Sequence, residues 1–117
     1  MRNELPVIQR IYDMILWMTN HLDHFPRARR YTLGTRIEDT LYDLLERCIE
    51  ARYTRDKAIK IGRLRSANTQ LEKLRYFIRL CHDQQLMSTR QYGFVSEKIN
   101  DIGVALGGWS KEVNRRQ

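Results

Sequence analysis

Apolar residues recur at alternating steps of three and four along most of this chain, and that spacing constrains the fold more than any other feature. Such steps place side chains on one face of an α-helix. Four runs with this spacing predict helices over residues 6–24, 31–52, 54–84 and 89–109. Because isolated helices are marginal in water, each must bury its apolar face against the others. We therefore expect an all-α protomer, an antiparallel up-down four-helix bundle formed as a single domain by residues 1–117.

Local signals support these helix limits. Pro6 stands near the first helical turn and Pro26 follows the first helix, while Ser88 to Gln91 has the Ser-x-x-Gln form of a capping box. Whether the last helix continues past Gly107 and Gly108 is left open. The two prolines and six glycines are too few for the frequent turns of an all-β fold.

The two cysteines and the hydropathy pattern bear on the cellular compartment. Cys48 and Cys81 fall on apolar helix faces, which predicts buried, reduced thiols rather than a disulfide. No stretch approaches the roughly 20 apolar residues that span a membrane. We expect a cytoplasmic protein without a membrane span.

Two features of the pattern raise the question of self-association. Apolar residues such as Met14, Trp17 and Phe77 flank the main helix faces, and they indicate either a wider core or a second buried face. A stripe of small residues runs along the last helix: Gly93, Ser96, Asn100, Gly103 and Gly107. Small side chains allow close approach of two backbones. The stripe therefore marks either an oligomer interface or close packing against the first helix.

Basic residues dominate the charge and are unevenly spread. Lysine and arginine number 21 against 14 acids, for a formal charge of +7, and 16 of the 21 are arginines. Arginine suits bidentate recognition of phosphate. Two windows, residues 27–36 and 52–65, hold more than the whole net charge and lie at opposite ends of the predicted bundle. The candidate nucleic-acid or partner-binding residues are Arg27, Arg29, Arg30, Arg36, Arg52, Arg55, Lys57, Lys60, Arg63, Arg65, Arg75 and Arg79.

These charges have a simpler interpretation as a solvated surface. An acidic stripe on the second helix offers intramolecular or intersubunit partners: Asp39, Asp43, Glu46 and Glu50. Tyr31 and Tyr53 border the two basic windows, where they either stack on bases or pack at helix ends. The sum of net charge, arginine bias and windows almost free of acids favours nucleic-acid binding.

Motifs for catalysis are missing from the sequence. There is no phosphate-binding loop, no nucleophile elbow and no cysteine pair at zinc-site spacing. His21 and His24 could present two imidazoles, but no further metal ligand accompanies them. We expect neither an enzyme nor a metal or other cofactor.

Four segments carry a resemblance to a known family. They are Phe25–Ile37, with its Leu-Gly-x-Arg turn, and Ile49–Lys57, Ala67–Arg75 and Ile102–Trp109. In this order they resemble the accessory variability determinant (Avd) proteins of diversity-generating retroelements, over roughly residues 6–111. The turn is shared with the wider four-helix-bundle family related to proteins encoded in ribosomal RNA intervening sequences.

The resemblance implies a basic four-helix protomer in a barrel-like homopentamer. It would bind the reverse transcriptase and the template RNA or its cDNA, and support mutagenic cDNA synthesis without performing chemistry itself. The alternative is a structural or adaptor bundle of the intervening-sequence type, whose cations serve solubility and assembly. The resemblance does not identify the target gene or the RNA element. It also leaves open which arginines contact RNA, the polymerase or a neighbouring protomer.

Overall fold

The computed structural model describes residues 4–116, and these residues are almost entirely helical. The elements are α1 (Glu4–Leu22), α2 (Arg27–Arg29), a π-helical turn η1 (Arg30–Gly34), α3 (Thr35–Tyr53), α4 (Lys57–Asp83) and α5 (Thr89–Asn114). No strand occurs among them. Since α2, η1 and α3 follow one another without a break, the described chain forms four long helical rods, as the apolar spacing predicts.

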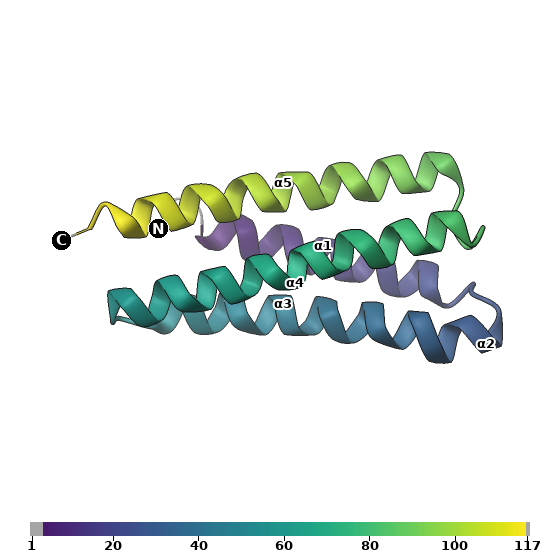
Figure 1. Ribbon diagram of the computed structural model, residues 1–117, viewed down its shortest axis with the longest axis horizontal. Coiled ribbons are helices and arrows are strands. Elements are labelled where there is room, and N and C mark those ends of the chain that lie inside the picture. The colour runs from purple at the N-terminus through teal and green to yellow at the C-terminus, as the bar shows by residue number, and fades with distance from the viewer. Residues whose placement is uncertain (1–3, 117) are drawn as a thin grey trace.

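The four rods lie side by side with alternating direction, in a molecule measuring 50 × 24 × 19 Å (Figure 1). Helix α1 packs against α3 and α5, and α4 packs against the same two. The turn between α1 and α3 lies at one end of the bundle, and the turn between α3 and α4 lies at the other (Figure 1). No helix among the described residues is long and apolar enough to cross a membrane.

One continuous apolar core runs along the bundle axis. It contains Leu41, Leu71, Ile99 and Trp109, each with at most 1% of its surface exposed. Met14 is buried, while Trp17 and Phe77 pack half-buried against the core, so these flanking residues belong to a wide core face. Ile49 and Leu80 stay exposed.

Both cysteines are buried and free, as predicted. Burial raises the pKa of the Cys48 thiol to about 12, and likewise that of Cys81 to about 12, because a thiolate would lose its hydration there. Neither is a reactive nucleophile at neutral pH.

The helix limits differ from the sequence expectations at several points. The second rod begins at Arg27 rather than residue 31, and η1 carries it into α3. Helix α4 begins at Lys57 rather than residue 54, because Asp56 adopts an extended backbone and its carboxylate accepts a hydrogen bond from the Ile59 N–H at 2.9 Å.

The remaining ends follow from capping and burial. Helix α1 ends at Leu22, two residues earlier than expected, in a turn that leads to Pro26. The predicted capping box of Ser88 and Gln91 forms at the start of α5. That helix continues through Gly107 and Gly108 to Asn114, since Trp109 and Val113 are both buried in the core.

Candidate nucleic-acid interface

The two basic windows lie at opposite ends of the bundle, as the sequence predicts for antiparallel helices. Residues 27–36 form α2, η1 and the start of α3, and residues 52–65 surround the turn between α3 and α4 (Figure 1). We call these the π-turn end and the α3–α4 end. The same residue types make different contacts at the two ends.

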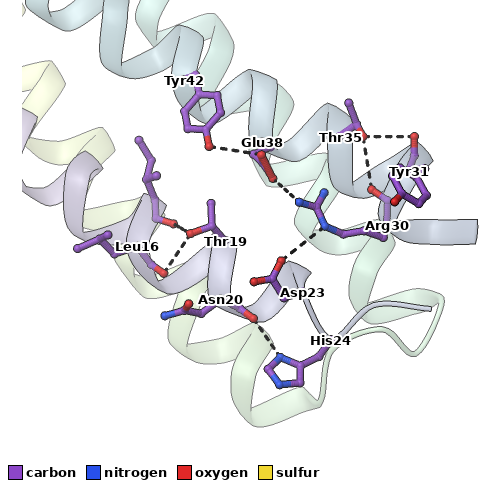
Figure 2. Close-up of polar contacts among 11 residues, drawn as sticks. Leu16, Thr19, Asn20, Asp23, His24, Arg30, Tyr31, Thr35, Glu38 and Tyr42 are labelled. Atoms are coloured by element: carbon purple, nitrogen blue, oxygen red, sulfur yellow. Dashed lines mark hydrogen bonds and ion pairs between the residues drawn. The ribbon is translucent and has the colours of Figure 1, made fainter. Parts of the chain in front are cut away.

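A widened helical turn shapes the π-turn end. The Thr35 hydroxyl lies 3.4 Å from the Arg30 carbonyl oxygen and 3.3 Å from that of Tyr31, and it donates to this pair (Figure 2). The Thr32 hydroxyl donates to the Ala28 carbonyl at 2.8 Å. These bonds satisfy carbonyl groups where the regular α-helical pattern is interrupted. Buried Gly34 completes the turn, and a Cβ there would lie 3.4 Å from the Arg30 guanidinium.

Arg30 has a structural role at this end. Its guanidinium donates to a Glu38 carboxylate oxygen at 2.9 Å and lies 3.8 Å from Asp23, so it ties the end of α1 to α3 (Figure 2). The Tyr42 hydroxyl donates to the second Glu38 oxygen at 3.3 Å. Burial, together with the negative charge of Glu38, raises the pKa of Tyr42.

The other three arginines of this window have no such role. Arg27, Arg29 and Arg36 are exposed, and none forms an ion pair within residues 4–116. Tyr31 is 70% exposed, and the Arg27 guanidinium lies 5.9 Å from the centre of its ring. Of the two roles that the sequence leaves open for Tyr31, packing at a helix end is therefore wrong for the protomer.

An open hollow of about 500 Å³ lies beside the turn, between its outer surface and the end of α4. We call it the π-turn hollow. The residues that line it are Arg29, Tyr31, Thr32, Leu33, Thr35, Arg36, Asp39, Leu80 and Gln84. It brings together two unpaired guanidinium groups, an exposed aromatic ring and several polar side chains.

At the α3–α4 end three of the six cations in the window are bonded or buried within the protomer. The Lys57 ammonium donates to the Asn114 carbonyl at 3.1 Å and also to the Arg116 carbonyl. Lys60 is only 7% exposed, which does not suit a phosphate contact at the protomer surface. Arg63 lies 3.3 Å from Glu50, the one member of the acidic stripe that forms an ion pair within the described part of the chain.

Fewer cations at this end remain available to a ligand. Arg55 and Arg65 are exposed and form no ion pair with another described residue. Tyr53 is 73% exposed rather than packed, with the Arg52 guanidinium 5.4 Å from its ring centre.

The structure adds two basic residues to this end that the charge windows missed. Because α5 continues to Asn114, Arg115 and Arg116 reach the α3–α4 end, where Lys57 contacts the backbone carbonyl of Arg116. Val113 continues the apolar spacing of the last helix, and this was the available sequence signal for their position.

The two remaining candidate arginines lie along α4. The Arg75 guanidinium donates to Glu72 at 2.9 Å and also to the Asn100 side-chain oxygen on α5. Arg79 lies 3.8 Å from Asp83 and is largely exposed. Arg75 therefore connects two helices of the protomer, and Arg79 belongs to the surface of α4 near the π-turn end.

The small-residue stripe of α5 faces two environments. A Cβ at Gly103 would lie 2.9 Å from the Arg75 guanidinium and 3.4 Å from the Leu71 side chain, so this part packs against α4 and not α1. Gly93 and Gly107 have open space where a Cβ would be. Intramolecular packing therefore explains Gly103 but neither of those two glycines. An oligomer interface along the stripe, Ser96 included, stays a prediction.

The two histidines near the end of α1 make contacts within the protomer. His21 stacks on Trp17 with ring centres 5.3 Å apart, and it hydrogen-bonds the Leu86 carbonyl oxygen at 3.2 Å. Partial burial lowers the His21 pKa. His24 hydrogen-bonds the Asn20 carbonyl oxygen at 3.0 Å. Within the part of the chain that the structure describes, no cluster of three metal-ligating side chains occurs.

Comparisons with known proteins place the chain in a family. A search of curated proteins found no match. Among solved structures, the bundle is similar to the crystal structure of a protein with unknown function from the S23 ribosomal protein family of Bacteroides thetaiotaomicron. The two share a TM-score of 0.85 and 14% sequence identity over 93% of this chain and 98% of the other, a likeness that shows the fold alone. The sequence model of the bAvd-like family matches residues 5–113, and neither match names a catalytic activity. The chain belongs to the bAvd-like family.

Proposed function

We propose that this protein is a non-catalytic accessory factor of a diversity-generating retroelement. In this role it binds the reverse transcriptase and the template RNA or its cDNA, as a homo-oligomer, and supports mutagenic cDNA synthesis in the cytoplasm. Membership of the bAvd-like family supports the accessory role. The observation that carries the binding role is the group of exposed arginines without ion pairs at the π-turn end: Arg27, Arg29 and Arg36.

Unpaired arginines on a surface favour an anionic partner for a physical reason. Three like charges close together in sequence repel one another, and within the described residues no carboxylate lies close enough to pair with them. A phosphate backbone relieves this repulsion and releases its own counterions on binding. Because phosphates occur in every sequence, such contacts give affinity with little sequence preference.

Self-association is part of the proposal. Val104 is 78% exposed in the middle of α5, and Tyr12 and Leu16 of α1 are each 51% exposed. Exposed apolar side chains on two adjacent helices, together with the open positions at Gly93 and Gly107, fit a surface that a second copy covers. A ring of five protomers, the number that the Avd resemblance implies, would repeat each basic end five times.

The binding role is tested with a triple variant. Arg27, Arg29 and Arg36 are replaced together by alanine, and the affinity for a structured template RNA is measured over a range of salt concentrations. For the wild type we expect affinity to fall steeply with salt. Each lost phosphate contact should reduce the log-log slope by about 0.7 to 0.9. The control matched in charge replaces three cations that form ion pairs inside the protomer, Arg63, Arg75 and Arg79. Its helical content is measured as well, because Arg75 also joins α4 to α5.

The same variants are then added to a reconstituted reverse transcription reaction. The triple variant should lose RNA affinity and mutagenic cDNA synthesis while it keeps its helical content and oligomeric state. If it binds RNA as the wild type does and still supports synthesis, this end is solvated surface. The structural or adaptor role would then account better for the chain, a role already suited to Arg30, Arg63 and Arg75, which pair with acids inside the protomer.

The oligomer is tested at a position that leaves the protomer intact. Gly103→Leu is unsuitable, because its side chain would collide with Arg75 and Leu71. Val104→Asp changes an exposed residue and should alter protomer stability by no more than about 0.5 kcal/mol. We expect the wild type to sediment as a stable oligomer and Val104→Asp to dissociate it. A 14.1 kDa wild-type species across micromolar concentrations contradicts the proposal.

A further inference from the structure

We propose that the π-turn hollow binds one unpaired nucleotide, with its base stacked on Tyr31 and its phosphate on Arg29 and Arg36. The inference rests on the proposed function, because it assumes a nucleic-acid ligand. It goes further by stating that a single-stranded segment is recognised at this place. Phosphate contacts alone would not require an unpaired base.

Tyr31 is unusual among the aromatic residues at the basic ends because its ring borders a hollow. It is 70% exposed and lines the hollow, and the one contact its ring makes with a cation or another ring among residues 4–116 is with the Arg27 guanidinium at 5.9 Å. Tyr53 has a similar arginine at 5.4 Å, but it lies at the α3–α4 end and does not line the hollow. Bases stack on tyrosine rings and on guanidinium planes alike, so Tyr31 and Arg27 together offer a stacking surface for a base.

The charges of the hollow suit a nucleotide. Arg29 and Arg36 line it with no ion pair inside the described chain, and Asp39 is the one carboxylate in the lining. Two guanidinium groups against one carboxylate leave the hollow positive, which favours a phosphate. The Asp39 carboxylate and the Gln84 amide can accept hydrogen bonds from the N–H groups of a base edge.

The volume and the lining of the hollow suit an unpaired base. Its volume of about 500 Å³ lies in the range of small-ligand sites. Apolar Leu33 and Leu80 contribute to the lining, so a base leaving water would find apolar contacts there. Bases inside a duplex are stacked and paired, and their faces are not accessible to a side chain that lines a hollow.

The local backbone explains why the site forms at this place. A π-helical turn adds a residue to the helical repeat, and such turns are frequent at functional sites. Here Tyr31 and Thr32 of η1 are exposed. Arg30 of the same turn is held by Glu38 (Figure 2). Arg30 therefore anchors the turn, while the next two residues, Tyr31 and Thr32, line the hollow.

The test compares two RNA ligands on the full chain. One is a fluorescein-labelled single strand of roughly 12 nucleotides, and the other is the same strand annealed to its complement. Fluorescence anisotropy gives the affinity for each. We expect Tyr31→Leu to weaken single-strand binding by about 5- to 150-fold, the effect of losing one stacked base, and to leave duplex binding within about twofold. Tyr31→Phe should bind as the wild type does.

Tyr76→Leu is the matched control, since Tyr76 is 66% exposed on α4 and does not line the hollow. It should bind both ligands normally. If Tyr31→Leu keeps wild-type affinity for the single strand, the inference is overturned while the proposed function stands. If the wild type binds neither ligand, the proposed function fails and the inference fails with it.

Discussion

The two ends of this bundle contain similar types of residue, but these residues make different contacts. Each has a window of cations and an exposed tyrosine beneath an arginine. At the π-turn end one cation, Arg30, anchors the turn, and three remain exposed beside a hollow. At the α3–α4 end Lys57 binds backbone carbonyls, Lys60 is buried and Arg63 pairs with Glu50.

This difference shows that the number of cations in a stretch of sequence is not the number available to a ligand. The α3–α4 window has the larger number of cations, six against four, and by sequence alone it would rank first. Its cations are partly used because a helix C-terminus and an acidic helix face lie beside them, and both attract positive charge. The π-turn end has fewer such partners, so the smaller window leaves three arginines exposed without an ion pair in the described chain, against Arg55 and Arg65 in the larger window.

The largest expected effect concerns the core that connects the two ends. Leu71 is fully buried near the middle of α4, and Leu71→Ala should lower the free energy of unfolding by about 2 to 5 kcal/mol. Cys81 lies near the π-turn end and Cys48 nearer the α3–α4 end, so thiol labelling reports on each end separately. Both thiols should label slowly in the native wild type and fast in denaturant.

In the Leu71→Ala variant both labelling rates should rise by a similar factor, because a small single core unfolds cooperatively. Acceleration of one thiol alone would show that the two ends open independently. Native labelling as fast as that of a free thiol would contradict the burial of that cysteine.

The second prediction concerns high pH. In the unfolded chain a thiol ionises near its ordinary pKa of 9.0, whereas burial raises the pKa in the folded state to about 12. Stability is therefore fully present below pH 9 and falls between pH 9 and 12, because only the unfolded state releases the proton. The loss should approach about 1.4 kcal/mol per pH unit for each thiol.

Comparison with Cys48→Ala and Cys81→Ala isolates the thiols from the lysines and tyrosines that titrate in the same range. Urea unfolding at several pH values above 9 should give a shallower decline for each variant than for the wild type, and by the same amount at both ends. A decline as steep as the wild type's in either variant would show that its thiol ionises in the folded protein.

The fold could be predicted from the sequence, and the roles of single cations could not. Steps of three and four specify a helix and its buried face, which is why the four rods, the buried cysteines and the opposite placement of the two windows followed from spacing alone. The π-helical turn was missed because its hydrogen bonds depend on Thr32, Thr35 and a buried glycine, a combination without a periodic signal. The hydrogen bonds from Lys57 to Asn114 and Arg116 span 57 and 59 positions of the sequence. The spacing of apolar residues carries no information about such distant contacts.

The third prediction tests the division of roles at the π-turn end. Arg30→Met leaves the Glu38 carboxylate, which is 23% exposed, without its guanidinium, and should cost about 1 to 3 kcal/mol. Arg29→Met removes an exposed cation without an ion pair and should change stability by less than about 0.5 kcal/mol. Urea unfolding measures both. Equal costs would mean that Arg30 is not the anchor of the turn.

The smallest expected effect tests the same division at the α3–α4 end. Lys57→Met removes an ammonium that donates to the Asn114 and Arg116 carbonyls at the C-terminus of α5, where the helix dipole also favours a positive charge. We expect the free energy of unfolding to fall by about 0.5 to 1.5 kcal/mol, with Arg55→Met as the neutral control.

Amide hydrogen exchange reports on the same contact. The amide hydrogens of residues 112–116 should exchange faster in Lys57→Met, because the last turn of α5 can then fray without breaking the hydrogen bonds to the Lys57 ammonium. Arg115 and Arg116 would then be held less firmly, so any contribution of this end to RNA binding should fall in Lys57→Met even though the arginines themselves are unchanged. Unchanged exchange at these amides would show that Lys57 is free for a ligand, and the two ends would then differ less than their contacts indicate.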